Sequence, residues 1–380
     1  MSTVIDNLVV KVAERCNLNC SYCFMYQHED QSYRNRPKFL EPAVYEQLFL
    51  RMNEYLERRP GRKMSLTLHG GEPTLFGIER TRRLVMRARE VVGDRLGSVN
   101  LQTNGTLLDA SWARLAAECG VAIGVSLDGP PEIHDAARVD HGGRGSHRAA
   151  VRGLRALQEV GFHPGVLCVI NPGTSGLAAY RHFRSLGVTS MDFLFPDVSW
   201  DHKDAWYGEF GPTPVSDYLI PIFDDWFAED DPDVKVRVLW GLLSALMGGG
   251  HPTDAFGNPM TSYLIIETDG SIRALDALRV CEDGIDDSGL TVFDHGFDDL
   301  AKGLPLVHAV VNEGIPLSST CQACSELDIC GGGYLPHRFS KAKRFDNPSV
   351  WCADILVLIA HLRNTITVPV AAPPAIRAVA

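Results

Sequence analysis

Three cysteines near the start of the chain have a spacing that suits metal ligation. Cys16, Cys20 and Cys23 follow the pattern C-x3-C-x2-C. Three thiolates on one tight loop can bind three irons of a cubane iron–sulfur cluster and leave the fourth iron open to another ligand. A closed zinc site needs a fourth protein ligand, for which His28 is the nearby candidate. The spacing therefore favours a cluster with one open iron, and a zinc site is the alternative.

A second group of cysteines lies near the other end of the chain. Cys321, Cys324 and Cys330 follow the pattern C-x2-C-x5-C, and Cys352 comes later. Four thiols can close a zinc ribbon or bind all four irons of a second cluster. Three further cysteines stand apart from both groups, and we expect them to be buried thiols without a metal: Cys119, Cys168 and Cys281.

The composition limits where such sites can function. The sequence has no run of about 20 apolar residues, so it predicts no membrane span. The first residues contain no basic segment followed by an apolar one, so no secretory signal is predicted, and we expect a cytoplasmic protein with reduced thiols. The formal net charge of −11 argues against nucleic-acid binding, which depends on Lys and Arg.

The first half of the chain alternates short apolar runs with helical patterns, and such alternation predicts an α/β fold with a parallel sheet. Apolar residues recur at helical spacing behind Pro42, and again behind Ser146, which is a candidate N-cap. Six strand–helix units are fewer than the eight of a full TIM barrel, so we predict a partial (β/α)6 barrel. The six expected strands are Leu8–Val12, Met64–Leu68, Val99–Leu101, Ala122–Leu127, Gly165–Ile170 and Met191–Phe195.

Polar and glycine-rich segments follow the first four expected strands. The first strand leads into the cysteine loop, the second ends at the sequence HGGEP, the third at QTNG and the fourth at SLDG. In barrels of this kind the chemistry gathers at the carboxyl ends of the strands. The sequence therefore predicts one site at that end of the barrel.

The remaining chain predicts three further regions. We expect a barrel over 1–200, a helical bridge over 201–255, a cysteine-rich domain over 256–352, and a last helix with a flexible tail over 353–380. The bridge has two helical patterns, Asp217–Phe227 behind Ser216 as N-cap and Leu239–Met247. The cysteine-rich region begins with a hairpin that has Leu264–Glu267 as its first strand, and the last helix is expected over Asp354–Asn364.

The first cysteine motif resembles the signature of radical S-adenosylmethionine (SAM) enzymes, because Tyr22 precedes its last cysteine and a strand precedes the loop. The resemblance implies a 4Fe-4S cluster that binds SAM. It also implies that the GGEP loop holds the SAM amino group through Gly70, Gly71, Glu72 and Pro73. Contacts to the ribose and the methionyl carboxylate would come from Gln102, Asn104 and Ser126. Arg138 is a candidate for an anionic group of SAM or substrate, and a surface ion pair is its alternative.

The second cysteine group resembles the SPASM extension of radical SAM peptide maturases, which in its complete form holds two auxiliary 4Fe-4S clusters. Leu275 and Tyr334 stand at positions where that pattern has thiols, and the segment 251–263 has no cysteine. The resemblance therefore implies one auxiliary cluster, bound by Cys321, Cys324, Cys330 and Cys352, and two 4Fe-4S clusters in all. It also makes Asp276 a candidate catalytic base with a raised pKa, and a turn-forming aspartate is the alternative.

The sequence between the last cysteines resembles the FxsB-like branch, which forms cyclophanes in ribosomally made precursor peptides. The implied radical takes a Cβ hydrogen, and the carbon radical adds to a nearby aromatic ring. An electron and a proton then leave, and the auxiliary cluster and Asp276 are their expected acceptors. His337 and Arg338 are candidates for steering a substrate carboxylate, or for structural roles.

The same resemblance names partners and rival functions. We expect a precursor peptide and an external electron donor such as flavodoxin or ferredoxin. The leader of the peptide would be bound by a separate leader-recognition protein, by the barrel surface, or not at all. One rival is an anaerobic sulfatase maturase, which oxidises Cys or Ser to formylglycine. The other rival belongs to a different class and is a zinc-binding regulatory or interaction protein.

Overall fold

The computed structural model describes residues 4–250, 253, 255–256 and 262–367. Within them, ten strands join one sheet in the order β10-β9-β8-β1-β2-β3-β4-β5-β6-β7. The strands are β1 Asn7–Ala13, β2 Met64–Gly70, β3 Leu96–Thr103, β4 Val121–Ser126, β5 Val166–Val169, β6 Ser190–Leu194, β7 Lys235–Val236, β8 Tyr263–Ile266, β9 Ser271–Arg273 and β10 Asp287–Thr291.

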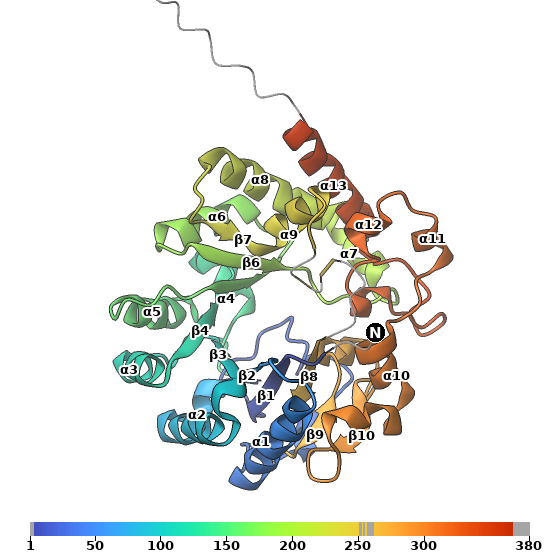
Figure 1. Ribbon diagram of the computed structural model, residues 1–380. Coiled ribbons are helices and arrows are strands. Elements are labelled where there is room, and N and C mark those ends of the chain that lie inside the picture. The colour runs from blue at the N-terminus through green and yellow to red at the C-terminus, as the bar shows by residue number, and fades with distance from the viewer. Residues whose placement is uncertain (1–3, 251–252, 254, 257–261, 368–380) are drawn as a thin grey trace, which may run out of the picture.

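The six expected strands are present and form the parallel centre of this sheet. Each of β1 to β6 pairs in parallel with its neighbour in sequence order. The short strand β7 extends the sheet beyond β6, and β8 pairs in parallel with β1 on the other side. Figure 1 shows the strands curving around a centre with helices outside them. The predicted partial barrel is confirmed.

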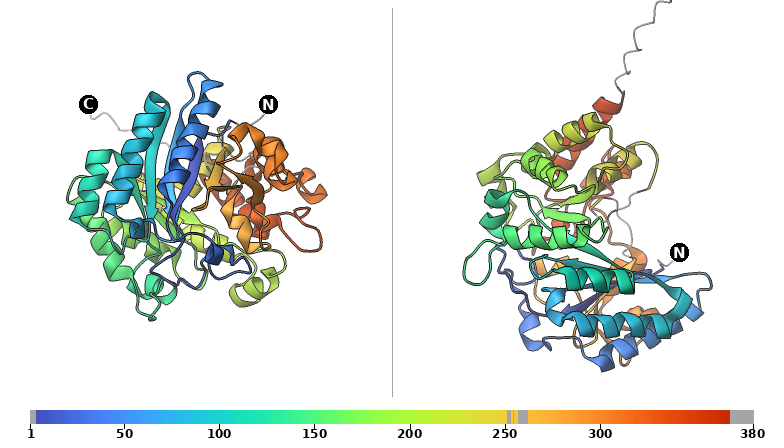
Figure 2. Two further views of the ribbon diagram at one scale, coloured as in Figure 1. Left: turned by 90° about the horizontal axis from the view of Figure 1, so that it is seen from below. Right: turned by 90° about the vertical axis from the view of Figure 1, so that its left-hand side faces the viewer.

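The helices come after the strands, as the crossover pattern requires. Figure 2 shows α1, α2, α3 and α5 side by side along the outside of the sheet. The helices are α1 Pro42–Glu57, α2 Ile78–Val92, α3 Ala110–Cys119, α4 Pro131–Ala137, α5 His147–Gln158, α6 Gly176–Ser185, α7 Lys203–Phe210, α8 Pro214–Glu229, α9 Arg237–Leu246, α10 Pro305–His308, α11 Ser319–Gln322, α12 Leu327–Cys330 and α13 Cys352–Thr367.

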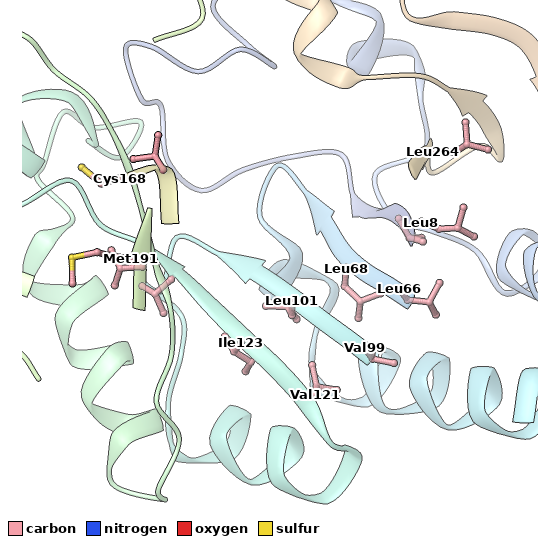
Figure 3. Packing of buried hydrophobic residues seen from close by; sticks show 14 of the residues in the cluster. Leu8, Leu66, Leu68, Val99, Leu101, Val121, Ile123, Cys168, Met191 and Leu264 are labelled. Atoms are coloured by element: carbon pink, nitrogen blue, oxygen red, sulfur yellow. The ribbon is translucent and has the colours of Figure 1, made fainter. Parts of the chain in front are cut away.

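Along the strands, buried apolar side chains alternate with side chains on the opposite face of the sheet. Residues such as Leu8, Leu68 and Ile123 are at most 5% exposed and belong to the main core, which Figure 3 shows in close-up. Side chains of a strand alternate between its two faces, so the intervening residues face the inside of the barrel. Lys11 and His69 are paired in the β1–β2 register and lie on that inner face.

One expected helix start is wrong, and one expected N-cap makes no side-chain cap bond. Helix α8 begins at Pro214, so Ser216 lies inside its first turn, where its N–H donates to Asp354 of α13 (3.0 Å). Proline is favourable in the first helical turn, because a backbone N–H at that position has no hydrogen-bond partner within the helix. Ser146 does precede α5, but its hydroxyl donates to the carbonyl of Arg138 (2.7 Å) and makes no cap bond.

The C-terminal part adds to the barrel sheet. The expected hairpin exists as β8 and β9, and the turn between them includes Gly270, whose φ is +86°. The expected helices at 239–247 and 354–364 correspond to α9 and α13. The domain boundaries stay a prediction, and the expected tail beyond residue 367 lies outside the described residues. No helix in the described ranges is long and apolar enough to cross a membrane.

Candidate active site

A cavity of about 810 Å³ opens at the carboxyl ends of the barrel strands. It collects most of the residues expected at the first site. Those that line it are Cys16, Cys20, Cys23, Gly70, Gly71, Gln102, Asn104, Ser126, Arg138 and Asp276. Residues of the loop after β1, of β2 to β6 and of the C-terminal region thus meet at one place, as the strand-end argument predicts.

Two glycines fix the cysteine loop against the end of β2. The N–H of Gly71 donates to the carbonyl of Ala13 (2.8 Å), and the N–H of Glu72 donates to that of Arg15 (2.9 Å). A Cβ on Gly71 would lie 2.0 Å from the Tyr26 hydroxyl oxygen and 2.5 Å from the backbone of Arg15, and one on Gly70 would lie 2.1 Å from the Ala13 oxygen. Only glycine fits at this contact, so the pair positions the loop that carries the thiols.

The three thiols of this loop are close enough to affect one another. Burial first, with smaller contributions from the nearby Cys20 and Cys23 thiols, raises the pKa of Cys16 to about 12. Burial also raises the pKa of Cys20 to about 11 and that of Cys23. Buried thiolates without a cation are unfavourable. The loop therefore needs positive charge, such as iron, if all three thiols are to ionise.

Glu72 and Pro73 do not line the cavity, and their expected contact with SAM stays a prediction. The Glu72 carboxylate is fully buried and accepts four hydrogen bonds. The donors are the N–H and hydroxyl of Thr74, the hydroxyl of Thr103 and the N–H of Asn104, at 2.5–2.9 Å. Its donors come from the segment after β2 and from the end of β3. This carboxylate therefore links the ends of the two strands.

Polar side chains at the ends of β3 and β4 reach the cavity. The amide of Gln102 donates to the Ser126 hydroxyl (3.0 Å), and a Cβ on Gly124 would collide with the Gln102 side chain at 2.3 Å. The amide of Asn104 donates to Asn17 Oδ1 (2.9 Å). Asn104 thus also holds the cysteine loop, in addition to its expected contact with SAM.

Arg138 is an inward-facing residue and not part of a surface ion pair. Its Nε lies 2.7 Å from Asp128 Oδ2, and its guanidinium lies 5.3 Å from the ring centroid of Tyr22. The Tyr22 hydroxyl donates to the same carboxylate oxygen (2.5 Å). Arg138 is 8% exposed. Arg138 therefore places a cation at the cavity wall, beside the cysteine loop.

Asp276 lies at the cavity in a setting that the sequence did not indicate. Its Oδ2 accepts from Lys11 Nζ (2.6 Å), and Lys11 Nζ lies 3.1 Å from His69 Nδ1. Burial alone would raise the pKa of Asp276, but Lys11 and then His69 lower it, so the net shift is downward. The expected rise in pKa is wrong, because the opposite charge of Lys11 outweighs desolvation.

The second group of thiols also comes together. Cys321 lies in α11, Cys330 ends α12 and Cys352 begins α13, in the region drawn in orange and red in Figure 1. Burial first, with smaller contributions from the thiols of Cys352, Cys321 and Cys324, raises the pKa of Cys330 to about 12. These thiols are thus near enough to interact electrostatically, and four thiols could bind all four irons of one cluster.

No three His, Cys, Asp or Glu side chains of the described residues converge closely enough to hold a single metal ion. The ligands of a cubane cluster bind different irons, so they stand further apart than the ligands of one ion.

Leu275 and Tyr334, at the two positions that lack thiols, lie in one apolar cluster. Leu275 is 3% exposed and Tyr334 packs against the same cluster, which also contains Cys281. The Cys281 thiol lies 3.7 Å from the carbonyl of Pro336. Apolar side chains thus fill this region among the described residues, and Cys281 is the buried thiol that was expected.

The two other candidates, Arg338 and His337, lie in different surroundings. Arg338 is fully buried and donates to the carbonyls of Pro316 and Phe345, so it has a structural role. His337 lines the cavity, and its Nε2 lies 3.7 Å from Asp197 Oδ1. His337 is therefore available to a substrate in the cavity.

Lys11 and His69 are the residues that the sequence reasoning missed. A lysine inside the apolar strand Leu8–Val12 was the available signal, since lysine is rarely buried without a partner. Its partner Asp276 lies 265 residues away, so the pair itself could not be read from local spacing.

Comparison with known proteins agrees with this geometry. Residues 10–176 match the model of the family described as the Radical SAM superfamily. The cysteine-type anaerobic sulfatase-maturating enzyme of Clostridium perfringens (strain 13) is 26% identical over 342 residues, which cover 88% of this chain and 90% of that enzyme. An uncharacterized protein of Synechocystis sp. is 31% identical over 369 residues, covering 90% of this chain and 86% of that protein.

A solved structure shares the fold. The structure described as native anSMEcpe with bound AdoMet and Cp18Cys peptide has a TM-score of 0.81 at 23% sequence identity. The match covers 95% of this chain and 99% of that one, so the barrel and the C-terminal region both have counterparts there.

Proposed function

This chain belongs to the radical SAM superfamily, and from that premise we propose that it is an enzyme that removes a hydrogen atom from a side chain of a bound peptide. The observation that carries the proposal is that one cavity brings all the expected groups together. Three thiols, two glycines, two polar strand ends and Asp276 all line it. The similar structure with a bound peptide supports a peptide as the substrate class.

The residues fit the family's cofactors. Cys16, Cys20 and Cys23 would hold a 4Fe-4S cluster, and four later thiols would hold an auxiliary one. SAM would contact the Gly70–Gly71 backbone and the Gln102–Ser126 pair, which face the same cavity. When bound, these cofactors supply a hydrogen-abstracting radical and an electron acceptor.

The chain's own groups would prepare and complete the reaction. Arg138, held by Asp128, offers a cation for an anionic group of SAM or substrate. Asp276 would take the proton that leaves the oxidised substrate. Because Lys11 lowers the pKa of Asp276, the carboxylate is ionised and ready to accept a proton from a strongly acidic intermediate.

The form of oxidation that the comparisons favour is sulfatase maturation, in which Cys or Ser becomes formylglycine. The test is anaerobic incubation of the reconstituted enzyme, with SAM and reductant, with paired peptides that carry Cys or Ser in a sulfatase motif. We expect an aldehyde that a hydrazide traps and mass spectrometry locates. Peptides that stay unmodified while SAM is cleaved would contradict this activity.

A second candidate is the formation of a cyclophane in a precursor peptide. It is supported by the C-terminal resemblance and by Leu275 and Tyr334, which occupy thiol positions of the complete extension within an apolar cluster. The test is co-expression with a short neighbouring open reading frame. Loss of two hydrogens without a trappable aldehyde, and with a crosslinked fragment, would support it. An unchanged mass would contradict it.

Asp276→Asn tests the part that both candidates share. We expect the variant to cleave SAM at a near-normal rate but to form little product, because the neutral amide accepts no proton. Wild-type product yield from this variant would remove Asp276 from the reaction. The electron donor and any leader-recognition protein belong to this proposal as expected partners.

A further inference from the structure

Asp197 differs from the other carboxylates of the cavity wall, because no Lys or Arg in the described part of the chain pairs with it. Three carboxylates of the described residues line the cavity: Asp192, Asp197 and Asp276. Lys11 Nζ lies 2.6 Å from Asp276 Oδ2, and Arg237 Nε lies 2.6 Å from Asp192 Oδ2. The side chain of Asp197 is 24% exposed. Asp197 can therefore pair with a cation that a ligand brings into the cavity.

The imidazole of His337 approaches Asp197 without binding it. Its Nε2 lies 3.7 Å from Asp197 Oδ1, which is beyond hydrogen-bond distance. This nitrogen is buried and has no hydrogen-bond partner among the described residues, although His337 lines the cavity. Buried polar atoms are normally hydrogen-bonded. The two groups therefore indicate a place where a ligand completes the hydrogen bonds.

Two further histidines lie near Asp197, but they do not replace the missing cation. His28 and His202 line the same cavity. Burial lowers the pKa of His28, and the opposing effect of Asp197 is smaller. His28 is therefore mainly neutral at pH 7. His202 is engaged with Ser199, whose Oγ lies 3.1 Å from His202 Nδ1.

Aromatic rings surround the same place. The ring of Phe195 is stacked with that of His337, with 6.5 Å between centroids, and Tyr334 meets the imidazole edge-on at 5.2 Å. Phe195, Tyr334 and Trp206 all line the cavity. A guanidinium is planar, binds a carboxylate through paired N–H groups and packs well on aromatic faces. A carboxylate beside aromatic rings therefore fits an arginine side chain.

We propose that Asp197 determines the specificity of the peptide site by binding an arginine side chain of the substrate. The inference rests on the proposed peptide oxidation. The 3-10 helix Asp276–Val280 packs against the 3-10 helix Leu335–Arg338, so the place occupied by Asp197 and His337 adjoins the proposed base. The arginine is thus expected within a few residues of the oxidised one. The net charge of −11 also favours a basic peptide over an acidic one.

Peptide binding tests the inference separately from turnover. The probes are fluorescein-labelled peptides of uncharged residues around one Cys, with a single arginine placed at each neighbouring position in turn. A matched set carries citrulline, which keeps the shape of arginine without its charge. Fluorescence anisotropy with the cluster-loaded protein and SAM gives the dissociation constants. We expect arginine at one position, or at two adjacent ones, to bind about ten- to a hundredfold more tightly than citrulline.

Asp197→Asn should remove this preference, because a neutral amide makes no charge-assisted hydrogen bond with the guanidinium. In turnover the variant should raise KM for the preferred arginine peptide at least about tenfold, with kcat near the wild-type value. Asp204→Asn is the matched control. It makes the same change in net charge at a side chain that is 92% exposed, and it should keep the preference.

Equal affinities of the wild-type protein for arginine and citrulline at every position overturn the inference. An arginine preference that survives in Asp197→Asn overturns it as well, because another group would then bind the guanidinium. Loss of the preference in Asp204→Asn would reveal a general effect of net charge and would also overturn it. A wild-type protein that prefers an arginine peptide but leaves every peptide unmodified contradicts the proposed function instead.

Discussion

At the scale of single residues, Gly71 controls where the three thiols lie. Gly71→Ala puts a methyl group where Tyr26 and the Arg15 backbone already lie, so the cysteine loop must shift. We expect the variant to lose the first cluster, with iron falling from about eight to about four per chain. Iron analysis and visible absorbance measure this.

The control for this prediction is Gly208→Ala. Nothing lies within 4 Å of a Cβ at Gly208, and the residue lies in α7. Its iron content should be unchanged. Full iron in Gly71→Ala would show that the loop tolerates the methyl group and would contradict the positioning role.

Residue types and spacing predicted the thiols well, but they predicted side-chain partners poorly. The glycine pair was expected to approach a ligand, yet in the structure it also approaches the cysteine loop. Glu72 was assigned to SAM because a carboxylate suits an ammonium. Besides the neighbouring Thr74, its donors are Thr103 and Asn104 at the end of β3, and no local pattern reveals that second contact.

At the scale of elements, α13 caps α8 through Asp354. Its Oδ1 accepts from the N–H groups of Val215 and Ser216, at 2.7 and 3.0 Å. Removing a capping side chain costs about 1–2 kcal/mol. We therefore expect Asp354→Ala to lower the free energy of unfolding by about that amount in denaturant titrations, and Asp354→Asn, which keeps one oxygen, to lower it less.

The control for the cap is Glu209→Ala, an exposed residue of α7, which should change stability little. Equal stabilities of Asp354→Ala and the parent would mean that solvent satisfies these N–H groups. The sequence placed both helices, but it misplaced the start of α8, because the capping residue comes from 138 positions further along the chain.

His134 connects β4, α4 and α5 and makes stability depend on pH. Its Nδ1 accepts from the Asp128 N–H (3.2 Å), and its Nε2 lies 2.9 Å from Ser146 Oγ. Burial lowers the pKa of His134 from 6.5 to about 3. The unfolded chain therefore binds a proton first as pH falls below 6.5, so acid destabilises the fold.

The expected result is a fall in unfolding free energy between about pH 7 and about pH 5.5, less steep in His134→Gln by about 1 kcal/mol per pH unit. Denaturant midpoints of the loaded protein at several pH values measure this. Identical pH slopes for the two proteins would mean that His134 takes up a proton in the folded state.

At the scale of the whole molecule, the two groups of thiols predict a definite metal content. An anaerobically prepared chain should hold about eight irons, since two cubane clusters are expected. The double variant Cys321→Ala/Cys324→Ala should keep about four and still cleave SAM. A colourless protein with bound zinc would contradict both clusters and favour the regulatory alternative.

The barrel was predictable from sequence because each strand–helix unit carries its own local pattern. The pairing of β8 with β1 was not, because it joins segments about 250 residues apart along the chain without any shared local signal. The short β7 has two residues, too few to show a pattern. The site could be located at the strand ends, whereas the Lys11–Asp276 contact depends on that distant pairing.

The position of β1 also affects how the protein is made. This strand is synthesised before its two neighbours but lies between β2 and β8 in the finished sheet. At roughly 5–20 residues per second, one side of β1 waits on the order of ten to fifty seconds for its neighbour to be synthesised. During that time its unpaired edge is open to pairing with other nascent chains. A low expression level and a low rate of translation initiation should therefore increase the fraction of chains that fold rather than aggregate.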